Sequence, residues 1–419
     1  MSDPSIYSTI KACRVCGNPN LIDVLDLGDH YLSGIFPTEE EKKFVPKVPL
    51  KLVKCDGDGC CELVQLSVSV KPELMYGNNY GYRSGLNQSM VHHLQSKVLK
   101  IEEKMDLCES DIIIDIGSND GTTLKSYSKG KLIGVDPTGK KFKTYYPDHI
   151  ELIDDFFPCP QLKNILKGGK AKVITSFSMF YDLESPIEFA NCIRDHLSND
   201  GIWVFEQSYL PFMIDTISFD TVCHEHLEYY DINSINYICK SAGLKIIDIE
   251  FNSVNGGSVS ITAAKNESKY EQWHSLKEHL DKEAAYRSKQ SFDDFREKIQ
   301  TAKEKMTNFL KDAVIKGEKV LGIGASTKGN TLLQYFEIDE QLISEIGEVN
   351  LEKVGNFTPG SNIKIRSEES VLSKRPDYLV VLPWHFSEFF KNNPKFLEEK
   401  LVFPLPEFTI YTRREEKSQ

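Results

Sequence analysis

The strongest constraint on the fold is an apolar stretch that leads directly into a glycine turn. Residues 111–116 read Asp-Ile-Ile-Ile-Asp-Ile, the pattern of a strand buried on both faces, and residues 117–121 continue as Gly-Ser-Asn-Asp-Gly. Glycine is required where the backbone turns sharply and approaches a ligand with no Cβ in the way. We therefore expect a buried strand, a ligand-binding turn and then a helix.

Further apolar runs follow this turn at spacings that leave room for helices, at residues 132–135, 172–175 and 201–205. Strands that alternate with helices at this rhythm predict a doubly wound α/β sheet. A second strand-and-glycine unit begins at Lys319, and another apolar run follows at residues 378–382. This second unit predicts a further Rossmann-like α/β domain.

The length of the chain and its local composition indicate several domains. At 419 residues, the chain is longer than one hydrophobic core usually supports. The first 75 residues are rich in turns and paired cysteines, and the stretch after residue 265 is rich in Lys, Glu, Gln and Ala, which is typical of solvated helices. We expect an α/β protein with a metal-binding module, a central doubly wound domain, a helical connector and a Rossmann-like domain, at residues 1–75, 76–265, 266–315 and 316–419.

The cysteines of the first 75 residues stand in two pairs. Cys13 and Cys16 form the first pair, and Cys55 is followed by both Cys60 and Cys61. Four thiolates in a tetrahedron are the usual ligands of structural zinc, and a site with four protein ligands has no open position for catalysis. The spacing therefore predicts a structural zinc site, with Cys60 and Cys61 both open as the fourth ligand. A redox pair and metal-free core cysteines are the alternatives.

Acidic residues around the glycine turn indicate the charge of its ligand. A dinucleotide fingerprint would place a pyrophosphate at the helix N-terminus, but here Asp115 and Asp120 stand beside the glycines. This favours a cationic ligand, such as the sulfonium and ammonium of S-adenosylmethionine. Asp136 ends the second strand, where a carboxylate accepts ribose hydroxyls, and residues 155–157 are placed near the adenine. The expected cofactor contacts are Asp115, Gly117, Ser118, Asn119, Asp120, Gly121, Asp136, Pro137, Asp155, Phe156, Phe157 and Ser176.

Residues 219–230 concentrate imidazoles, carboxylates and phenols, including His224, Glu225 and His226. Histidine is the side chain whose pKa best suits proton removal near pH 7, so we interpret this segment as the source of a general base. Metal ligation and a hydrogen-bonded core are the alternatives. The aromatic segment at residues 76–84 reads as a loop that covers the active site, or as core.

Charge and hydropathy exclude some functions and partners. The net charge of −12 argues against a general nucleic-acid surface. The sequence has no apolar run of about 18 residues and no signal-peptide pattern at its start, so we expect a cytoplasmic protein without a membrane partner. The ten cysteines suit a reducing compartment. Nothing in the sequence requires a protein partner, and a monomer agrees with it.

Taken together, these motifs resemble the sugar C-methyltransferases, which add a methyl group to C3 of nucleotide-linked 4-keto-6-deoxyhexoses. The resemblance spans almost the whole chain in the order of that family. Its marks are Cys-x-x-Cys-Gly, Leu-Asp-Leu-Gly, Cys61-Glu-Leu-Val-Gln-Leu66, the Tyr-x-Tyr stretch, Asp-Ile-Gly-Ser-Asn-Asp-Gly, Asp-Phe-Phe, Glu225-His226, the segment from Gly322 to Thr331, and Thr358-Pro359-Gly360.

The resemblance implies a zinc-binding module, a central S-adenosylmethionine domain and a C-terminal domain that helps to hold a dTDP- or GDP-linked sugar. It also implies that His226 removes the C3 proton, that Glu225 orients the imidazole and that Tyr80 or Tyr82 lies near the keto oxygen. His224 occupies a position where better-known members of the family carry a different residue. It could therefore be the group that orients the base, or it could be the base itself. The implied substrate contacts are Tyr80, Tyr82, Arg83, Glu206, Lys328, Asn330 and Thr331.

Two other functions remain open at this point. One is O- or N-methylation of another small metabolite, which needs no acidic carbon in the acceptor. The other is a non-catalytic binding or assembly protein that keeps the cofactor fold, against which the titratable residues near the glycine turn argue.

Overall fold

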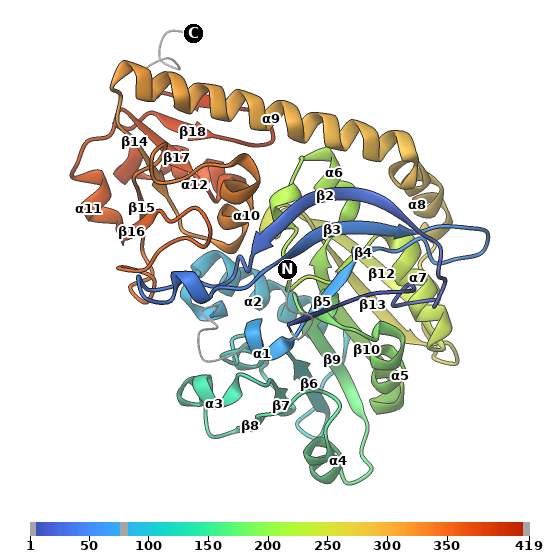
Figure 1. The fold of residues 1–419 in the computed structure, drawn as a ribbon. Coiled ribbons are helices and arrows are strands. Elements are labelled where there is room, and N and C mark those ends of the chain that lie inside the picture. The colour runs from blue at the N-terminus through green and yellow to red at the C-terminus, as the bar shows by residue number, and fades with distance from the viewer. Residues whose placement is uncertain (1–5, 76–82, 414–419) are drawn as a thin grey trace.

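The computed structural model describes residues 6–75 and 83–413 (Figure 1). Tyr80 and Tyr82, two of the expected active-site residues, lie outside these ranges. Within the described residues, no helix is both long enough and apolar enough to cross a membrane.

The N-terminal module is a small antiparallel unit. Its main sheet has the order β11-β4-β3-β2, and a separate pair joins β1 to β5. The strands are β1 Tyr7–Thr9, β2 Leu21–Tyr31, β3 Lys47–Cys55, β4 Val64–Leu66, β5 Val68–Val70 and β11 Glu228–Tyr229. The short helix α1 Pro72–Met75 follows β5. Strand β11 belongs to the histidine segment of the central domain and pairs with β4. The module and the histidine segment therefore share one sheet.

The central domain is built on a seven-stranded sheet with the order β12-β13-β10-β9-β6-β7-β8. Its strands are β6 Ile112–Ile116, β7 Lys131–Val135, β8 Ile150–Ile153, β9 Ala171–Phe177, β10 Leu197–Ser208, β12 Leu244–Asn252 and β13 Ser258–Lys265. The strands are parallel except β13, which runs antiparallel to both of its neighbours. The strand order reverses between β6 and β9. In open parallel sheets, ligands bind at this reversal, beside the carboxyl ends of the strands.

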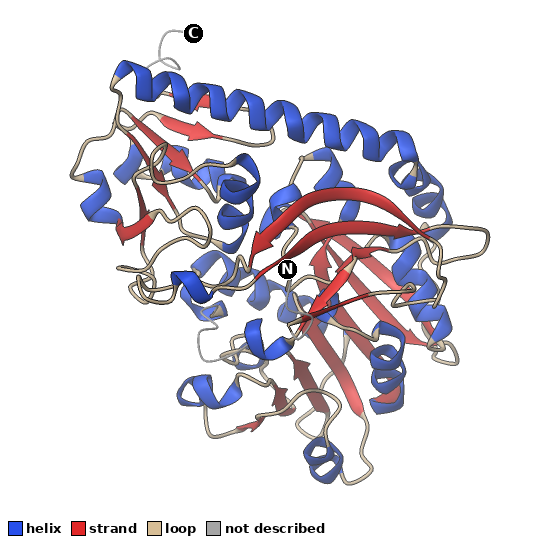
Figure 2. Ribbon diagram, viewed as in Figure 1, coloured by secondary structure: helices blue, strands red, loops and turns tan. Residues whose placement is uncertain are grey.

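Helices cover both faces of this sheet (Figure 2). The helices of the domain are α2 Gln88–Lys104, α3 Gly139–Phe142, α4 Pro160–Leu166, α5 Pro186–His196, α6 Leu210–Asp215, which packs toward the connector, and α7 Ile232–Ser241. Helix α2 contributes Val98 and Ile101 to one apolar cluster, whereas Phe189 of α5 and Ile235 of α7 belong to another. Both faces of the parallel strands are therefore buried, which explains their nearly continuous apolar sequences.

A long helix connects the central and C-terminal domains. After α8 Leu276–Glu283, helix α9 runs over Lys289–Lys316 and spans the top of the molecule in Figure 1. The Ser288 side chain caps its start by accepting a hydrogen bond from the backbone N–H of Ser291, and Gly317 ends it at a φ of +72°. Its apolar side chains, among them Phe292 and Met306, are buried on one face. The connector therefore packs against the protein along its length.

The C-terminal domain has a six-stranded sheet with the order β16-β15-β14-β17-β18-β19. The elements are β14 Val320–Ile323, α10 Thr327–Phe336, β15 Glu345–Glu348, β16 Lys364–Ser367, α11 Glu368–Leu372, β17 Tyr378–Val381, α12 Ser387–Asn392, β18 Leu401–Phe403 and β19 Thr409–Tyr411. All pairs are parallel except that of β18 with β19. One apolar cluster joins this sheet to the connector, to Leu52 of the module and to Phe219 of the histidine segment. The expected α/β architecture is confirmed, and the expected residue boundaries of the domains stay predictions.

Candidate active site and metal centre

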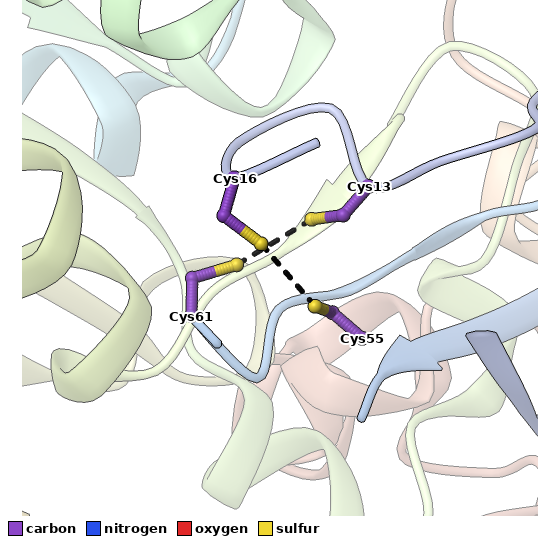
Figure 3. Close-up of side chains that lie close together, drawn as sticks. All are labelled: Cys13, Cys16, Cys55 and Cys61. Carbon is purple, nitrogen blue, oxygen red and sulfur yellow. Dashed lines mark hydrogen bonds between the residues drawn. The ribbon is translucent and has the colours of Figure 1, made fainter. Parts of the chain in front are cut away.

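Four cysteines of the module converge on one point (Figure 3). The sulfur atoms of Cys13, Cys16, Cys55 and Cys61 all lie within 4.8 Å of one another. The Sγ atoms of Cys13 and Cys61 are 3.4 Å apart, as are those of Cys16 and Cys55. Cys60 lies beside the cluster, with its Sγ 3.5 Å from the carbonyl oxygen of Cys55. The structure thus places Cys61, rather than Cys60, as the fourth member.

The geometry and chemistry of this cluster fit zinc. Zinc–sulfur bonds of about 2.3 Å in a tetrahedron separate the sulfurs by about 3.8 Å, which agrees with the observed spacing. The hydrogen bond from Cys61 lowers the pKa of Cys13 to about 5, so a thiolate forms readily here. Cys13, Cys16, Cys55 and Cys61 would hold the ion. Because four protein ligands close the coordination shell, the site has a structural role.

The glycine turn after β6 has the backbone that its sequence predicts. Gly117 and Gly121 have φ values of +71° and +74°, in the left-handed region that favours glycine. A Cβ at Gly117 would lie 3.0 Å from the side chain of Met179, and one at Gly121 would lie 3.0 Å from the ring of Tyr146. The phenol oxygen of Tyr146 also lies 2.8 Å from both Ser118 Oγ and the carbonyl oxygen of Asn119, and its single proton can be donated to that carbonyl. The turn is therefore closely packed, and only glycine suits these two positions.

Buried carboxylates surround this turn. Asp115 is the second-last residue of β6, with only 2% of its surface exposed, and it accepts a hydrogen bond from Thr175 Oγ1 at 2.5 Å. Burial raises the pKa of Asp115 to about 7, against the opposing effect of the Thr175 bond. Asp136, at the end of β7, accepts hydrogen bonds from the backbone N–H groups of Asn119 at 2.7 Å and Thr138 at 2.6 Å. These carboxylates give the turn the negative character that a sulfonium or ammonium ligand requires.

The described end of the aromatic loop lies against the turn. The backbone N–H of Ser84 donates to Asn119 Oδ1 at 2.9 Å, and that of Gly85 donates to Asp120 Oδ2 at 3.1 Å. The guanidinium of Arg83 lies 4.3 Å from the centroid of the Tyr145 ring. The first described residues after Tyr82 therefore lie against the cofactor turn.

Some residues expected to contact the cofactor make other contacts. Ser176 is fully buried and accepts a hydrogen bond from Trp203 Nε1 at 2.9 Å, so its hydroxyl faces the core. The ring of Phe157 packs against Phe189, with centroids 5.2 Å apart, whereas Phe156 is 59% exposed. The Asp155 carboxylate accepts a hydrogen bond from the backbone N–H of Phe156. Of the two phenylalanines, Phe156 is therefore the one whose ring remains accessible to a ligand. Pro137 directly follows Asp136 at the end of β7.

His226 has the properties of a neutral base. Its Nδ1 lies 3.1 Å from the carbonyl oxygen of Thr221, and because a carbonyl can only accept, Nδ1 carries the proton and Nε2 keeps its lone pair. The ring lies against Tyr181, with centroids 4.2 Å apart. Burial lowers the pKa of His226 to about 4, and Lys328 contributes to this shift. The imidazole is therefore unprotonated at neutral pH.

His224 and Glu225 point elsewhere. His224 is fully buried, and its Nε2 lies 3.1 Å from the carbonyl oxygen of Val48 in β3, so it joins the histidine segment to the module. A Cβ on Gly34 would overlap Glu225 Oε1, which places this carboxylate against the module. Burial raises the pKa of Glu225. The carbonyl of Thr221, not the implied Glu225, orients the imidazole of His226 in this structure.

Helix α10 of the C-terminal domain packs against the histidine segment and brings three of the implied substrate residues with it. Asn330 Nδ2 donates to the carbonyl of Ser33 at 2.7 Å, and Thr331 Oγ1 donates to the carbonyl of Val222 at 3.1 Å. Both side chains are fully buried and hold the segments together. The charge of Lys328, the third of these residues, contributes to the lowered pKa of His226.

Glu206, another implied substrate residue, already has protein partners. Its carboxylate lies 2.6 Å from His93 Nε2 and 3.0 Å from Lys97 Nζ, and it accepts a hydrogen bond from Asn252 Nδ2 at 2.9 Å. The charges of His93 and Lys97 hold the pKa of Glu206 below its usual value against the effect of burial, which raises it. Glu206 therefore fixes α2 and the end of β12 beside the site. The sequence pattern did not single out His93, Lys97 or Asn252.

The fold and these two sites define a methyltransferase with a cysteine-bound zinc module, and comparisons with known proteins agree. Three family models match the chain in order: a zinc binding domain over residues 13–76, a methyltransferase domain over 88–249 and a C-methyltransferase C-terminal domain over 253–406. The C-methyltransferase NovU of Streptomyces niveus is 27% identical over 411 residues, which cover 96% of this chain and 97% of NovU. The chain is thus an S-adenosylmethionine-dependent C-methyltransferase related to NovU, and the predicted family resemblance and the predicted cofactor and zinc are confirmed.

Two solved methyltransferase structures resemble less than half of the chain. A methyltransferase from Clostridium acetobutylicum is 13% identical with a TM-score of 0.33, over 42% of this chain and 92% of that chain. The CcbJ methyltransferase of Streptomyces caelestis is 11% identical with a TM-score of 0.33, over 41% of this chain and 89% of its own. These scores are too low to carry an inference about substrate.

Proposed function

We propose that this C-methyltransferase adds a methyl group to C3 of a 4-keto-6-deoxyhexose linked to dTDP or GDP. The observation that carries the proposal is the protonation state of His226. Its Nδ1 is committed to the carbonyl of Thr221, and burial lowers its pKa to about 4. A neutral imidazole with its Nε2 lone pair available is the form needed to remove a proton from carbon.

The acceptor must have an acidic carbon for such a base to act. In a 4-keto sugar, the neighbouring ketone acidifies the C3 proton, because the resulting negative charge is delocalised onto the keto oxygen. His226 Nε2 would take this proton, and the ring contact with Tyr181 would hold the imidazole plane during the transfer. S-adenosylmethionine, when bound at the glycine turn, supplies an electrophilic methyl group. The expected chemistry needs no metal at the reacting carbon.

The surrounding protein would position the sugar. Glu206 fixes the end of β12 through Asn252, and α10 joins the C-terminal domain to the histidine segment through Thr331. The implied role of Arg83, Tyr80 and Tyr82 in covering the substrate stays a prediction. Its support is that the described end of their loop binds to Asn119 and Asp120.

The role of His226 is tested by following deuterium incorporation at sugar C3 in heavy water, with S-adenosylhomocysteine in place of the methyl donor. We expect His226→Ala to slow the exchange by a factor of about 100 or more, the usual contribution of a general base. His224→Asn keeps a donor that can reach the Val48 carbonyl and should exchange at close to the wild-type rate. Loss of exchange confined to His224→Asn would make His224 the base. Exchange at the wild-type rate in both variants would remove both histidines from the mechanism.

The reaction class is tested separately by measuring S-adenosylhomocysteine formation on a panel of nucleotide sugars. We expect turnover with a 4-keto sugar and none with its 4-hydroxy counterpart, because only the ketone acidifies C3. Equal turnover of both sugars would favour O-methylation. No turnover of any nucleotide sugar would favour another small acceptor.

A further inference from the structure

A buried polar cluster lies where the C-terminal domain meets the histidine segment. Asp220 belongs to the short 3-10 helix η6 (Phe219–Thr221), and Trp384 to η9 (Trp384–Phe386). Trp384 Nε1 donates a hydrogen bond to Asp220 Oδ2 at 2.8 Å. Asp220 is fully buried, and its Oδ1 has no hydrogen-bond partner among the residues that the structure describes. The carboxylate is therefore fixed across the domain junction with one oxygen directed into it.

Lys328, in the first turn of α10, faces the same junction. A Cβ built on Gly256 would lie 3.8 Å from Lys328 Nζ and 3.6 Å from His385 Cβ, which places the ammonium against the turn that follows β12. Burial lowers the pKa of Lys328, whereas the Asp220 carboxylate opposes this shift. Burial raises the pKa of Asp220 to about 6, and Lys328 opposes that shift in turn. The opposite charges of Lys328 and Asp220 therefore each favour the charged form of the other group.

The charge of Lys328 also acts on the imidazoles around it. After burial, Lys328 is the group that lowers the pKa of His226, and it lowers the pKa of His385 in the same way. With a pKa of about 2, His385 is neutral and adds no charge to the junction. Lys328 thus adds to the effect of burial, which is the main reason that the base is unprotonated, and its ammonium is near enough to interact with charge on a molecule bound beside His226.

We propose that Lys328 is a catalytic residue that contacts the C4 keto oxygen of the sugar and stabilises the negative charge that develops there. Asp220, anchored by Trp384, is the positioning residue for this ammonium. The inference rests on the proposed function. It assigns the stabilisation of the charge on the keto oxygen to a residue of the C-terminal domain.

The electrons balance as follows. The C3–H bond breaks, its proton passes to His226 Nε2, and its electron pair forms the C3–C4 double bond while the carbonyl pair moves to the oxygen beside Lys328. The oxygen pair then restores the carbonyl as C3 forms its bond to the donated methyl. The pair of the broken methyl–sulfur bond stays on the leaving thioether. Lys328 donates a hydrogen bond throughout and transfers no proton.

The test compares Lys328→Met with the wild type and with Lys305→Met, which removes an exposed lysine of α9. C3 deuterium exchange and methyl transfer are measured over a range of pH with a dTDP-linked and a GDP-linked 4-keto-6-deoxyhexose. We expect Lys328→Met to lose about 100-fold or more in both rates, the usual effect of removing an oxyanion donor, with S-adenosylmethionine affinity within about twofold. Lys305→Met should match the wild type.

The pH profile separates a catalytic from a structural role. The groups facing His226 are Tyr181, Lys328 and, through Lys328, Asp220 and His385. Removing the Lys328 charge raises the pKa of His226, so the acid limb of the rate profile should move to higher pH in Lys328→Met. Asp220→Asn keeps an acceptor for Trp384 but lowers the pKa of Lys328, so its basic limb should move to lower pH.

The outcomes are distinguishable. Lys328→Met at the wild-type rate, or a lower rate with an unchanged acid limb, would overturn the role of Lys328. If Lys328→Met does not fold, the role of Lys328 is overturned instead by a basic limb of the pH–rate profile that is the same in Asp220→Asn as in the wild type. If the wild-type enzyme neither exchanges nor methylates either sugar, the proposed function itself fails.

Discussion

At the scale of single residues, burial sets the protonation of the site. Asp115 is buried and His226 is half-buried, and burial shifts their pKa values in opposite directions because it disfavours the charged form of each. The pKa of the Asp115 carboxyl is raised to about 7, so this group is partly protonated at neutral pH. The imidazole is held in its neutral, basic form. Burial therefore shifts the protonation both of a carboxyl beside the cofactor turn and of the base.

Asp115 should also affect stability in a pH-dependent way. Its pKa is raised from 3.8 to about 7 in the folded protein, so the folded state holds a proton that the unfolded chain releases. The free energy of unfolding of the ligand-free wild type should therefore fall, relative to Asp115→Asn, as the pH rises from about 4 to 7. We expect a relative change of about 2–4 kcal/mol, from about three pKa units at 1.36 kcal/mol each. Urea unfolding of both proteins across this range measures it, and a constant difference would contradict it.

At the scale of elements, a buried ion cluster fastens the connector to the rest of the molecule. Arg287, between α8 and α9, lies 2.6 Å from Asp231 Oδ2 and 3.0 Å from Glu62 Oε2. Asp231 is the N-cap of α7, and Glu62 belongs to the module. The guanidinium therefore joins three elements that are distant in sequence, and its removal would leave buried carboxylates without their partner.

Replacing this arginine should be costly. We expect Arg287→Met to lower the free energy of unfolding by about 3–5 kcal/mol, the usual result of removing one partner from a buried ion pair. The exposed pair of Lys282 with Glu278 provides the control, and Lys282→Met should leave the free energy of unfolding close to that of the wild type because water screens exposed pairs. Chemical denaturation of both variants gives the two values. Similar losses in the two variants would show that the Arg287 cluster has no special role.

At the scale of the whole molecule, the zinc module supports the active site. Strand β11 begins two residues after His226 and completes the sheet of the module, and His224 binds the carbonyl of Val48 within that sheet. The site of the base is therefore built partly on the module. Loss of zinc should weaken both the fold of the module and the placement of His226.

Zinc binding can be assigned to individual cysteines. We expect Cys61→Ser to lose zinc and most of its methyl transfer, because Cys61 Sγ belongs to the four-sulfur cluster. Cys60→Ser should keep one zinc per chain and near wild-type activity, because Cys60 lies outside this cluster. Metal analysis of the purified variants distinguishes the two. Zinc loss in Cys60→Ser with retention in Cys61→Ser would reverse the ligand assignment.

The features of the fold and of the sites that the sequence could predict are those that depend on short, local residue patterns. The turn at Gly117 follows from a strand-and-glycine pattern, and Cys13 with Cys16 from a metal-ligand spacing. The contact of Asp220 with Trp384 joins residues 164 positions apart, and no local pattern encodes it. The sequence could not show that Glu206 already has partners, because His93, Lys97 and Asn252 come from distant segments. Asn330 likewise carries the sequence of a substrate motif, but the packing of α10 directs its side chain to Ser33.

The central claim is that the methyl group is transferred to the carbon that His226 deprotonates. The most direct measurement uses a donor with a ¹³C-labelled methyl group and a dTDP-linked or GDP-linked 4-keto-6-deoxyhexose, with NMR of the purified product. We predict that the labelled methyl is bonded to C3 and that the C3 proton is absent. A labelled methyl on a hydroxyl oxygen, with the C3 proton retained, would contradict the account.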